Sequence, residues 1–298
     1  MRISVRIFFA LFGITALVGL FALLYDSEPH YHGRGLSHWL AVARSSDASA
    51  DQRQEACDAI RQIGPNALPD LLRWAVGHRS QTKIKIQTFI RQHPTAFIPK
   101  WLRKWADTYP DQTRANEARL AFLILGPKAA PLIPELTRLA TAVPPEPGEY
   151  WAISTLGDIG PQALPALITT MDGSVRKKIA ALGAIRNLGT NAFPTLPRII
   201  RLLDDPERYV TYASASTLGD LGLNPQLSIP ALIKCLQHSD SHLRMMAALS
   251  LARFGPDAHV VIPELQKAES METDENAKSA LQQTLRFLDA KAPSNTGP

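Results

Sequence analysis

Two patterns of hydrophobic and polar positions divide this chain. Residues 7–25 form one uncharged apolar run of nineteen residues. From 36 to 289, short stretches rich in Ala, Leu and Ile recur between Gly, Pro and polar residues, which predicts a series of helices. Residues 26–35 are interpreted as a linker, and 290–298 as a disordered tail, because their composition is polar and rich in turn-forming residues.

The run at 7–25 predicts a transmembrane helix. Nineteen helical residues reach about 28 Å, close to the hydrocarbon thickness of a bilayer. Arg2 and Arg6 precede the run, and Asp26 and Glu28 follow it. Because positive charge is retained on the cytoplasmic side, we expect residues 1–25 to anchor the chain with its N-terminus inside.

A cleaved signal peptide is the alternative for this run. Its apolar region would span about 7 to 15 residues and end in a small-x-small cleavage site. Residues 22–26 read Ala-Leu-Leu-Tyr-Asp and offer no such site, and no Cys follows for a lipid anchor. The sequence therefore favours an uncleaved anchor.

One phrase recurs along the rest of the chain. It joins an apolar stretch to Gly, often followed by Pro, then to a second Pro, as in Leu-Gly-Asp-Ile-Gly-Pro-Gln-Ala-Leu-Pro at 156–165. The turn residues are Gly, with His in one degenerate copy, at positions 64, 93, 126, 160, 189, 222 and 255. Successive copies lie 29 to 34 residues apart, which indicates a repeat architecture.

Each copy predicts two helices. The first, such as 178–185, is small and apolar and ends at a Gly that can adopt the left-handed conformation. The second, such as 197–203, begins near a Pro, which suits the first turn of a helix. Polar linkers at 204–206 and 238–241 supply turns and N-caps for the next copy.

The pattern resembles HEAT repeats, and in particular the short bacterial HEAT-like repeats of phycobilisome lyases. Their A-x-x-A-L-G-x-I-G-P-x-A…I-P-x-L consensus is visible at 151–167 and 247–265. The resemblance covers roughly 52–285 and implies an all-α fold, a solenoid of about seven helical hairpins over 36–289. It also implies that the second helices line a concave surface. For function it implies only a binding scaffold, because such repeats serve unrelated partners.

Departures from the repeat mark its ends and one insertion. The Pro-rich stretch 143–148 should protrude as a loop between the third and fourth copies. A first helix near 37–40 is interpreted as an N-terminal cap, in which Trp39 covers the apolar face of the first repeat. The more polar last helix, about 273–288, suits a C-terminal cap.

Composition excludes several classes of function. With 45% hydrophobic and 20% charged residues, the chain is not intrinsically disordered. Cys57 and Cys235 are too few for a disulfide framework and, in separate repeats, too far apart to bridge, so we expect buried free thiols. The eight His show no zinc-ligand spacing, and no nucleophile–base arrangement is evident. We therefore expect no catalytic residue, no metal and no cofactor.

A ladder of cations appears when the repeats are aligned on the proline of the second helix. Four residues after that proline, six of seven repeats carry Arg or Lys, and only the fourth, with Thr169, does not. We call these residues the basic ladder: Arg73, Arg103, Arg138, Arg201, Lys234 and Lys267. They either favour the helix dipole at a helix C-terminus or form a groove for an extended anionic ligand such as an acidic peptide.

A second basic feature follows the anchor. Residues 71–106 contain eight cations and no acid, so that without them and the two N-terminal arginines the chain carries −5. Besides Arg73 and Arg103 they comprise Arg79, Lys83, Lys85, Arg91, Lys100 and Lys104. Trp74, Trp101 and Trp105 accompany them, which suits anionic lipid headgroups or an acidic partner. In the alternative interpretation the tryptophans are core residues and the cations a solvated face.

These features predict a non-catalytic, single-pass scaffold that binds a protein partner through its concave, partly basic surface, to which an acidic partner would be complementary. We expect it in the cytoplasmic membrane of a bacterium, with the solenoid on the outer, periplasmic side. Two alternatives stay open: a bilin-lyase-like enzyme or maturation factor, and an anionic lipid or polyanion binder using 71–106. We expect no nucleic-acid partner, and the net charge of +5 is too modest to indicate one. Oligomeric state and the identity of the partner are not encoded in any pattern found.

Overall fold

The computed structural model describes residues 28–76, 90, 92, 110–143 and 148–290. These residues belong to two units, one ending at Asp70 and one beginning at Leu71, a boundary inside helix α4. The predicted transmembrane segment 7–25, the cluster residues from Arg79 to Lys104 and the tail beyond Ala290 lie outside the described residues.

The first unit starts with a small hairpin where the sequence predicted a linker. Strands β1 (His30–Tyr31) and β2 (Arg34–Gly35) pair antiparallel. Between them His32 and Gly33 have φ of +49° and +73°, the left-handed pair that a two-residue hairpin turn requires. The two left-handed residues therefore order this short segment as a hairpin. The prediction of a linker relied on its polar composition and did not take the turn into account.

The first unit continues with helices that bury the predicted cap residue. These are α2 (Leu36–Arg44), α3 (Ala50–Ile63), the 3-10 turn η1 (Gly64–Ala67) and the start of α4 (Leu68–Val76). Helix α2 packs on α3, and Trp39 is 4% exposed with its indole N–H donating to the Tyr31 carbonyl oxygen at 3.3 Å. Ser49 and Gln52 form a capping box that begins α3.

The second unit repeats a helical hairpin. Its first helices are α7 (Pro110–Leu125), α9 (Glu149–Ile159), α11 (Val175–Arg186), α13 (Arg208–Leu221), α15 (Ser241–Ala252) and α17 (Glu275–Ala290). Its second helices, besides α4, are α8 (Ile133–Thr141), α10 (Leu164–Thr170), α12 (Leu196–Arg201), α14 (Pro225–Cys235) and α16 (Ile262–Met271). The turns and short extensions are η2 (Gly126–Leu132), η3 (Pro161–Ala163), η4 (Gly189–Thr195), η5 (Leu202–Asp204) and η6 (Gly255–Val261).

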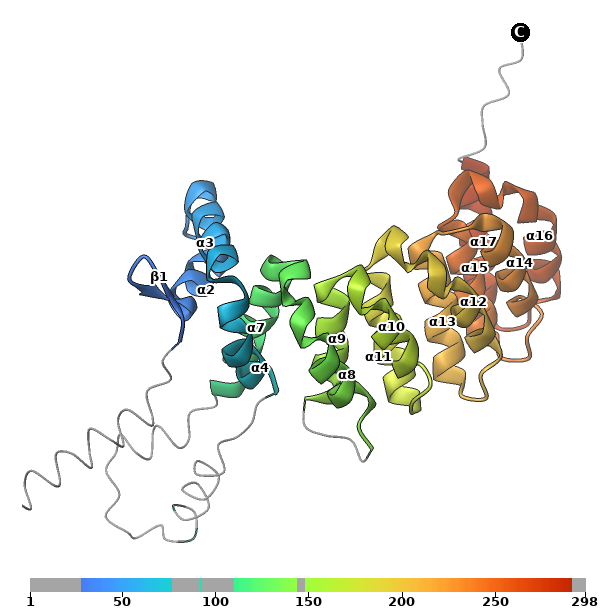
Figure 1. Ribbon diagram of the computed structural model, residues 1–298. Coiled ribbons are helices and arrows are strands. Elements are labelled where there is room, and N and C mark those ends of the chain that lie inside the picture. The colour runs from blue at the N-terminus through green and yellow to red at the C-terminus, as the bar shows by residue number, and fades with distance from the viewer. Residues whose placement is uncertain (1–27, 77–89, 91, 93–109, 144–147, 291–298) are drawn as a thin grey trace, which may run out of the picture. The chain divides into compact units, whose positions relative to one another are not determined.

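Helices of the second unit form two layers (Figure 1). Along the layer of first helices, each member from α9 onward packs against the next, ending with α15 against α17. The second helices form the other layer, and each from α8 onward packs against the first helix of the following repeat, as α8 does against α9 and α14 against α15. Fully buried residues such as Leu156, Leu182 and Leu218 lie in the first helices, between the layers. The all-α solenoid predicted from the repeat is thereby confirmed.

The turn glycines behave as predicted. Each described turn glycine has positive φ, namely Gly64, Gly126, Gly160, Gly189, Gly222 and Gly255. A side chain there would be strained, so Gly ends the first helix and allows the chain to reverse. Most second helices then carry Pro at their second residue, as in Pro134 of α8 and Pro263 of α16.

The sixth repeat departs from this pattern. Helix α14 begins at Pro225, directly after Asn224, whose φ of +46° is left-handed. The aligned proline, Pro230, consequently lies inside the helix rather than at its start. Asn tolerates the left-handed region better than other residues with a side chain, and Pro225 is already suited to the first helical turn. The helix therefore starts one turn earlier than the repeat predicts.

Consecutive repeats of the second unit are joined by a recurring polar contact. A donor near the start of one first helix binds an acid in or beside the linker that leads to the next. Lys178 Nζ lies 2.6 Å from Asp205 Oδ2, and the Tyr212 hydroxyl donates to Asp240 Oδ2 at 2.5 Å. The third such contact joins Arg244 to Glu272. Asp240 is also the N-cap of α15, as predicted for its linker, because it accepts from the His242 and Leu243 amides.

The 143–148 insertion begins beside a buried ion pair. Lys177 Nζ lies 3.2 Å from Glu149 Oε2 and donates to the Ala142 carbonyl oxygen at 2.7 Å. Both charged side chains are under 5% exposed, whereas Val143 is 91% exposed. The pair therefore connects α11 to both ends of the insertion, whose residues 144–147 lie outside the described range.

Within the described part of the chain, one helical stretch, Arg114–Thr141, passes a test of length and hydropathy for crossing a membrane. It consists of α7, η2 and α8, so its course is interrupted at Gly126, where φ is +49°. Core helices of soluble proteins pass the same test, and α7 and α8 both pack against α9. This stretch is the hairpin of the third repeat.

Candidate functional site

The described members of the basic ladder all lie on second helices. Arg73 is on α4, Arg138 on α8, Arg201 at the end of α12, Lys234 on α14 and Lys267 on α16, and each is exposed. Arg103 lies outside the described residues. The register read from the sequence therefore places the described cations at equivalent points of one helical layer.

The ladder is not uniform in its charge. Arg138 donates from Nε and Nη2 to the carboxylate of Glu135, one turn earlier on α8, and this hydrogen bond lowers the pKa of Glu135. In contrast, Arg201, Lys234 and Lys267 form no ion pair with any described residue. These three occupy consecutive repeats, and we call them the unpaired triad.

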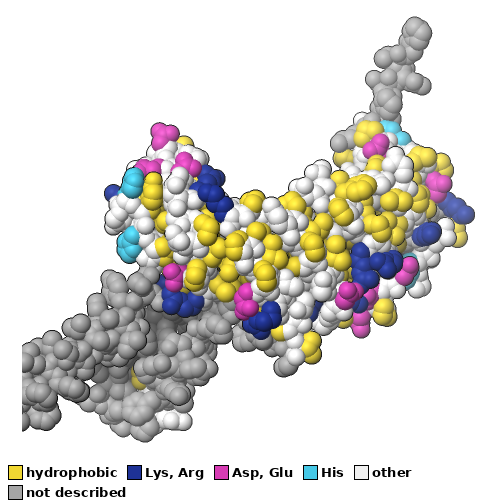
Figure 2. Space-filling model, in the orientation of Figure 1, with side chains coloured by type: hydrophobic (Ala, Val, Ile, Leu, Met, Phe, Trp, Pro, Cys, Tyr) yellow, Lys and Arg dark blue, Asp and Glu magenta, His cyan; other side chains and the backbone are white. Residues whose placement is uncertain are grey.

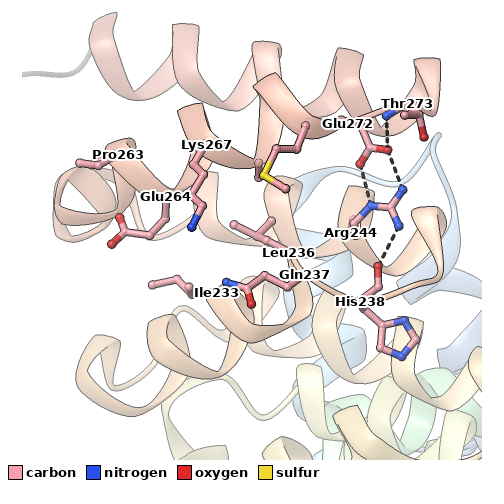
Figure 3. A pocket seen from close by; sticks show the side chains of 12 residues that line it. Ile233, Leu236, Gln237, His238, Arg244, Pro263, Glu264, Lys267, Glu272 and Thr273 are labelled. Atoms are coloured by element: carbon pink, nitrogen blue, oxygen red, sulfur yellow. Dashed lines mark hydrogen bonds and ion pairs between the residues drawn. The ribbon is translucent and has the colours of Figure 1, made fainter.

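A groove lies between α14 and α16, and one member of the triad, Lys267, lines it (Figure 3). It has a volume of about 660 Å³. Its apolar lining is contributed by Ile233, Leu236, Pro263, Ala268 and Met271. Its polar lining is contributed by Gln237, His238, Arg244, Glu264, Lys267, Glu272 and Thr273. Lys267 thus belongs both to the ladder and to the groove.

An ion pair closes one end of the groove. Arg244 donates from Nε to Glu272 Oε2 at 2.7 Å and from Nη2 to Glu272 Oε1 at 2.6 Å. Its Nη1 also donates to the His238 carbonyl oxygen at 2.8 Å. The hydrogen bonds from Arg244, with those from two backbone amides, lower the pKa of Glu272 to about 2. Because each charge has its partner, this end is a rigid wall and not an open charged site.

The centre of the groove combines a free cation with apolar surface. Lys267 extends from α16 toward Ile233 of α14 and toward Gln237, which follows that helix, and Glu264 lies at the end away from the ion pair (Figure 3). Met271, at the end of α16, is 71% exposed. Methionine adapts its shape to different apolar partners, so the groove can accept an apolar side chain next to a carboxylate.

Figure 2 shows the wider surroundings on the face that it displays. Hydrophobic side chains spread over the second unit, and Lys and Arg occur in separate groups, several of them beside Asp or Glu. Among the cations of the ladder, only those without an acidic partner remain available to an external anion. Of the described ladder residues, Arg138 is neutralised by Glu135, whereas the triad is not paired with any described acid.

The tryptophan beside Arg73 is a core residue. Trp74 is 4% exposed, and the Arg114 guanidinium lies 4.7 Å from the centre of its ring. It is therefore unable to reach a lipid headgroup or a partner. Trp101 and Trp105 lie outside the described residues, together with Arg79, Lys83, Lys85, Arg91, Lys100 and Lys104.

Neither thiol forms a disulfide. Cys235 is buried, its Sγ lies 3.5 Å from the Ala231 carbonyl oxygen, and burial raises its pKa to about 11. Cys57 is only half-buried, unlike the prediction, since the buried residues of α3 are Ala56, Ala59, Ile60 and Ile63. Over the residues described, no group of three or more His, Cys, Asp and Glu side chains could hold a metal ion.

The sequence reasoning missed the apolar half of the groove. Leu236 and Met271 belong to different repeats, and nothing in the spacing of either residue indicates that they line one surface. One signal was present, since Met271 is a large apolar residue at a helix end followed by polar residues. Such a residue is either capped by its neighbours or exposed for binding.

Comparison with known proteins supports the repeat. Residues 196–286 match the family model described as HEAT repeats. No curated protein sequence has significant similarity to this chain. Two solved structures of Kap121p, bound to Nup53p and to Ste12p, are 18% and 17% identical, with TM-scores of 0.45 and 0.44. Each alignment covers 86% of this chain and 34% of Kap121p, so this chain spans about a third of that protein.

A third solved structure is the complex of CpcE and CpcF of phycocyanin lyase from Nostoc sp. PCC7120. It is 19% identical, with a TM-score of 0.32, over 89% of this chain and 99% of that chain. The segment matched by the family model contains the triad and the groove. The matched residues 196–286 thus resemble HEAT repeats, and a helical hairpin of the same kind recurs in the described residues before them.

Proposed function

We propose that this protein is a non-catalytic HEAT-repeat scaffold that binds a protein partner through its layer of second helices. In this proposal residues 7–25 hold it in the cytoplasmic membrane of a bacterium, with the repeats on the outer side. The observation that carries the binding proposal is the groove between α14 and α16. It is lined by Lys267, one of three exposed cations on consecutive second helices that have no acidic partner among the described residues.

The chemistry of the groove favours a macromolecular partner. Its lining is part apolar and part charged. The Met271 side chain is 71% exposed, so its apolar surface is removed from water only when a partner packs against it. Methionine, arginine and aromatic residues are enriched at protein interfaces, where a partner supplies the missing apolar neighbours. Cations at the rim then select a partner of opposite charge and contribute less to the affinity.

A binding role without catalysis is supported by the state of the polar side chains near the groove. Arg244 and Glu272 are bound to each other, and burial raises the pKa of Cys235 to about 11. A thiol with such a pKa is almost entirely protonated at neutral pH and is a poor nucleophile. The remaining polar groups of the groove are suited to hydrogen bonding.

The binding proposal is tested by reversing the triad in the full chain, with Arg201→Glu, Lys234→Glu and Lys267→Glu combined. Proteins cross-linked to the tagged chain in membranes would be recovered, and the cross-linked sites located by mass spectrometry. We expect sites on α12, α14 and α16 in the wild type, and recovery reduced about tenfold or more in the variant.

A matched control reverses three exposed cations outside the second helices, Arg53 on α3, Arg176 on α11 and Arg286 on α17, which have no ion pair among the described residues. It changes the net charge equally and should leave recovery unchanged. Equal recovery from both variants, or cross-links confined to other surfaces, would exclude binding through the second helices. Circular dichroism of each variant checks that the helices remain folded.

The membrane proposal has its own test. A reporter that is active only outside the cytoplasm would be fused to the C-terminus of the full chain, and a second reporter, active only inside, would be fused in parallel. We expect activity only from the external reporter, and retention of the chain in the membrane after alkaline extraction. Activity of the internal reporter, or release from the membrane, would overturn the proposed topology.

A further inference from the structure

We infer that the triad and the groove recognise an extended acidic segment with a carboxylate at every third residue and a bulky apolar side chain at the end nearest Lys267. This inference rests on the proposed function and specifies its ligand. It is carried by three features: the register of the triad, the absence of competing acids in two of its three helices, and the position of the groove.

The spacing of the triad sets the period of the ligand. Arg201, Lys234 and Lys267 each stand four residues after the aligned proline, on α12, α14 and α16. Helix α12 contacts α14, and α14 and α16 line the groove together. Packed helices lie about 8–10 Å apart. An extended chain advances about 3.3 Å per residue, so three residues span the distance from one cation to the next.

Local charges make this part of the ladder attractive to carboxylates. One turn before Arg201 stands Arg198, and one turn before Lys234 stands Ala231, whereas Arg138 has Glu135 at that point and is paired with it. Arg198 itself is paired with Asp172. The position that neutralises Arg138 in α8 therefore carries no acid in α12 or α14. An acidic segment meets no repulsion from that position along these two helices.

The groove determines the direction in which the segment binds and where its acidic part ends. Glu264 lies on α16 one turn before Lys267, at the end of the groove away from the Arg244–Glu272 pair. Its carboxylate disfavours a further acid there. Met271, one turn after Lys267 and 71% exposed, lies on the other side of Lys267 and can cover one bulky side chain, with the nearly buried Leu236 beneath it. The acidic run therefore extends from Lys267 toward α12, and the apolar residue fits into the groove.

The volume and the polar lining of the groove favour an extended ligand over a helix. A volume of about 660 Å³ is within the range of pockets that hold small ligands, and is small for a helix about 10 Å wide. Gln237 and Thr273 at the groove provide side-chain partners for the backbone of an extended segment. A helix would instead present carboxylates at seven-residue intervals to meet the same cations, since seven helical residues rise about 10.5 Å.

The test uses the full chain in detergent micelles and three fluorescent peptides of equal composition. The first has Glu at i, i+3 and i+6, flanked on both sides by Phe in a Gly/Ser background. The second has the three Glu adjacent, and the third has them at i, i+7 and i+14. Binding is measured by fluorescence anisotropy at low and high salt. We expect the first peptide to bind about tenfold tighter than either other peptide, with affinity decreasing at high salt.

Two variants locate the bound peptide. Lys234→Glu should weaken the first peptide about tenfold and remove its advantage over the second, whereas Met271→Gln should weaken it without changing the salt dependence. Arg286→Glu, on α17, is the control and should change nothing. Circular dichroism confirms that each variant is folded.

The other outcomes overturn the inference. Equal binding of the first two peptides shows that charge is read without spacing, and tighter binding of the third shows a helical ligand. No binding of any peptide also excludes an acidic segment as the ligand. After any of these outcomes, the proposed function still holds if cross-linking to a protein partner depends on the triad. Failure of the inferred ligand is therefore distinguishable from failure of the proposed function.

Discussion

Glu272 illustrates how a single side chain organises a junction between repeats. Its carboxylate accepts from two nitrogens of Arg244 and from the backbone amides of Thr273 and Asp274, so it binds the start of α15 to the start of α17. Hydrogen bonds to the charged form stabilise it, and the pKa of Glu272 decreases from 4.5 to about 2. The side chain is only 2% exposed, which limits screening by salt.

This arrangement predicts a pH dependence of stability. Because the pKa is lower in the folded than in the unfolded state, the stabilisation is complete above pH 4.5 and is lost as the pH decreases toward 2. Glu272→Gln should reduce the free energy of unfolding by about 2 kcal/mol at pH 7, and the difference should nearly disappear at pH 2. Urea unfolding followed by circular dichroism between pH 7 and pH 2 measures both.

Glu275→Gln is the control for this change. It removes the same charge from an exposed position in the first turn of α17, where the cost is about 0.5 kcal/mol. If both variants had the same free energy of unfolding at every pH, the contribution of the Arg244–Glu272 pair would be refuted.

At the scale of the helices, close approach depends on small residues. A Cβ atom at Gly219 of α13 would lie 2.6 Å from the Ser250 Cβ of α15, and one at Gly157 of α9 would lie 2.8 Å from the Ala184 carbonyl oxygen of α11. These glycines therefore permit the stacking of first helices. Gly183 of α11 differs, because no side chain and no neighbouring helix lies within 4 Å of such a Cβ.

The difference predicts opposite effects of one substitution. Gly219→Ala should destabilise the protein by about 1–3 kcal/mol, since α13 and α15 must separate to admit a methyl group. Gly183→Ala should instead stabilise it by about 0.5–1 kcal/mol, because Ala favours a helix where there is space for its methyl group. Chemical denaturation of the two variants decides the matter, and equal effects of the same sign would contradict this account of the packing.

At the scale of the whole molecule, contacts are made between neighbours along the chain. Helix α17 packs against α15 and α16 and ends the second unit, and its Leu281 and Leu288 are nearly fully buried. In a stack of repeats each hairpin is stabilised by the adjacent hairpins, so the last helix protects the apolar face of the one before it. Damage at the end should therefore weaken the nearest repeats most.

Leu281→Ala tests this dependence on neighbours. The cavity should cost about 2–5 kcal/mol, and hydrogen exchange should accelerate in α15 and α16 more than in α9 and α11. Gln283→Ala, at an exposed position of the same helix, should change neither. Uniform acceleration throughout the second unit would show that it unfolds as one cooperative block.

The repeat was readable from the sequence because its signals are local. A first helix ends where Gly adopts positive φ, and the second begins at Pro, so turn positions such as Gly126 and Gly189 were predicted correctly. The same reasoning failed at Pro230, because the earlier start of α14 depends on the conformation of Asn224. It also failed at 30–35, where a two-residue turn produces a hairpin.

The candidate site was only partly readable. Register predicted the ladder and its placement on second helices, and the i−3 acid that neutralises Arg138 is visible in the sequence as Glu135. Yet Lys267 has Glu264 at the same spacing and forms no ion pair with it. Side-chain orientation within the packed layer decides between these outcomes, and sequence spacing does not report it.

By itself, the sequence determined the helical hairpins, the length of each repeat and the equivalence of the ladder positions. These features depend on helix ends and registers, which are set by residues close together in the chain. Only the tertiary structure decided which cations are left without a partner and where a groove opens between α14 and α16. The lining of that groove comes from residues about thirty positions apart, such as Leu236 and Lys267, which meet only when one hairpin packs on the next.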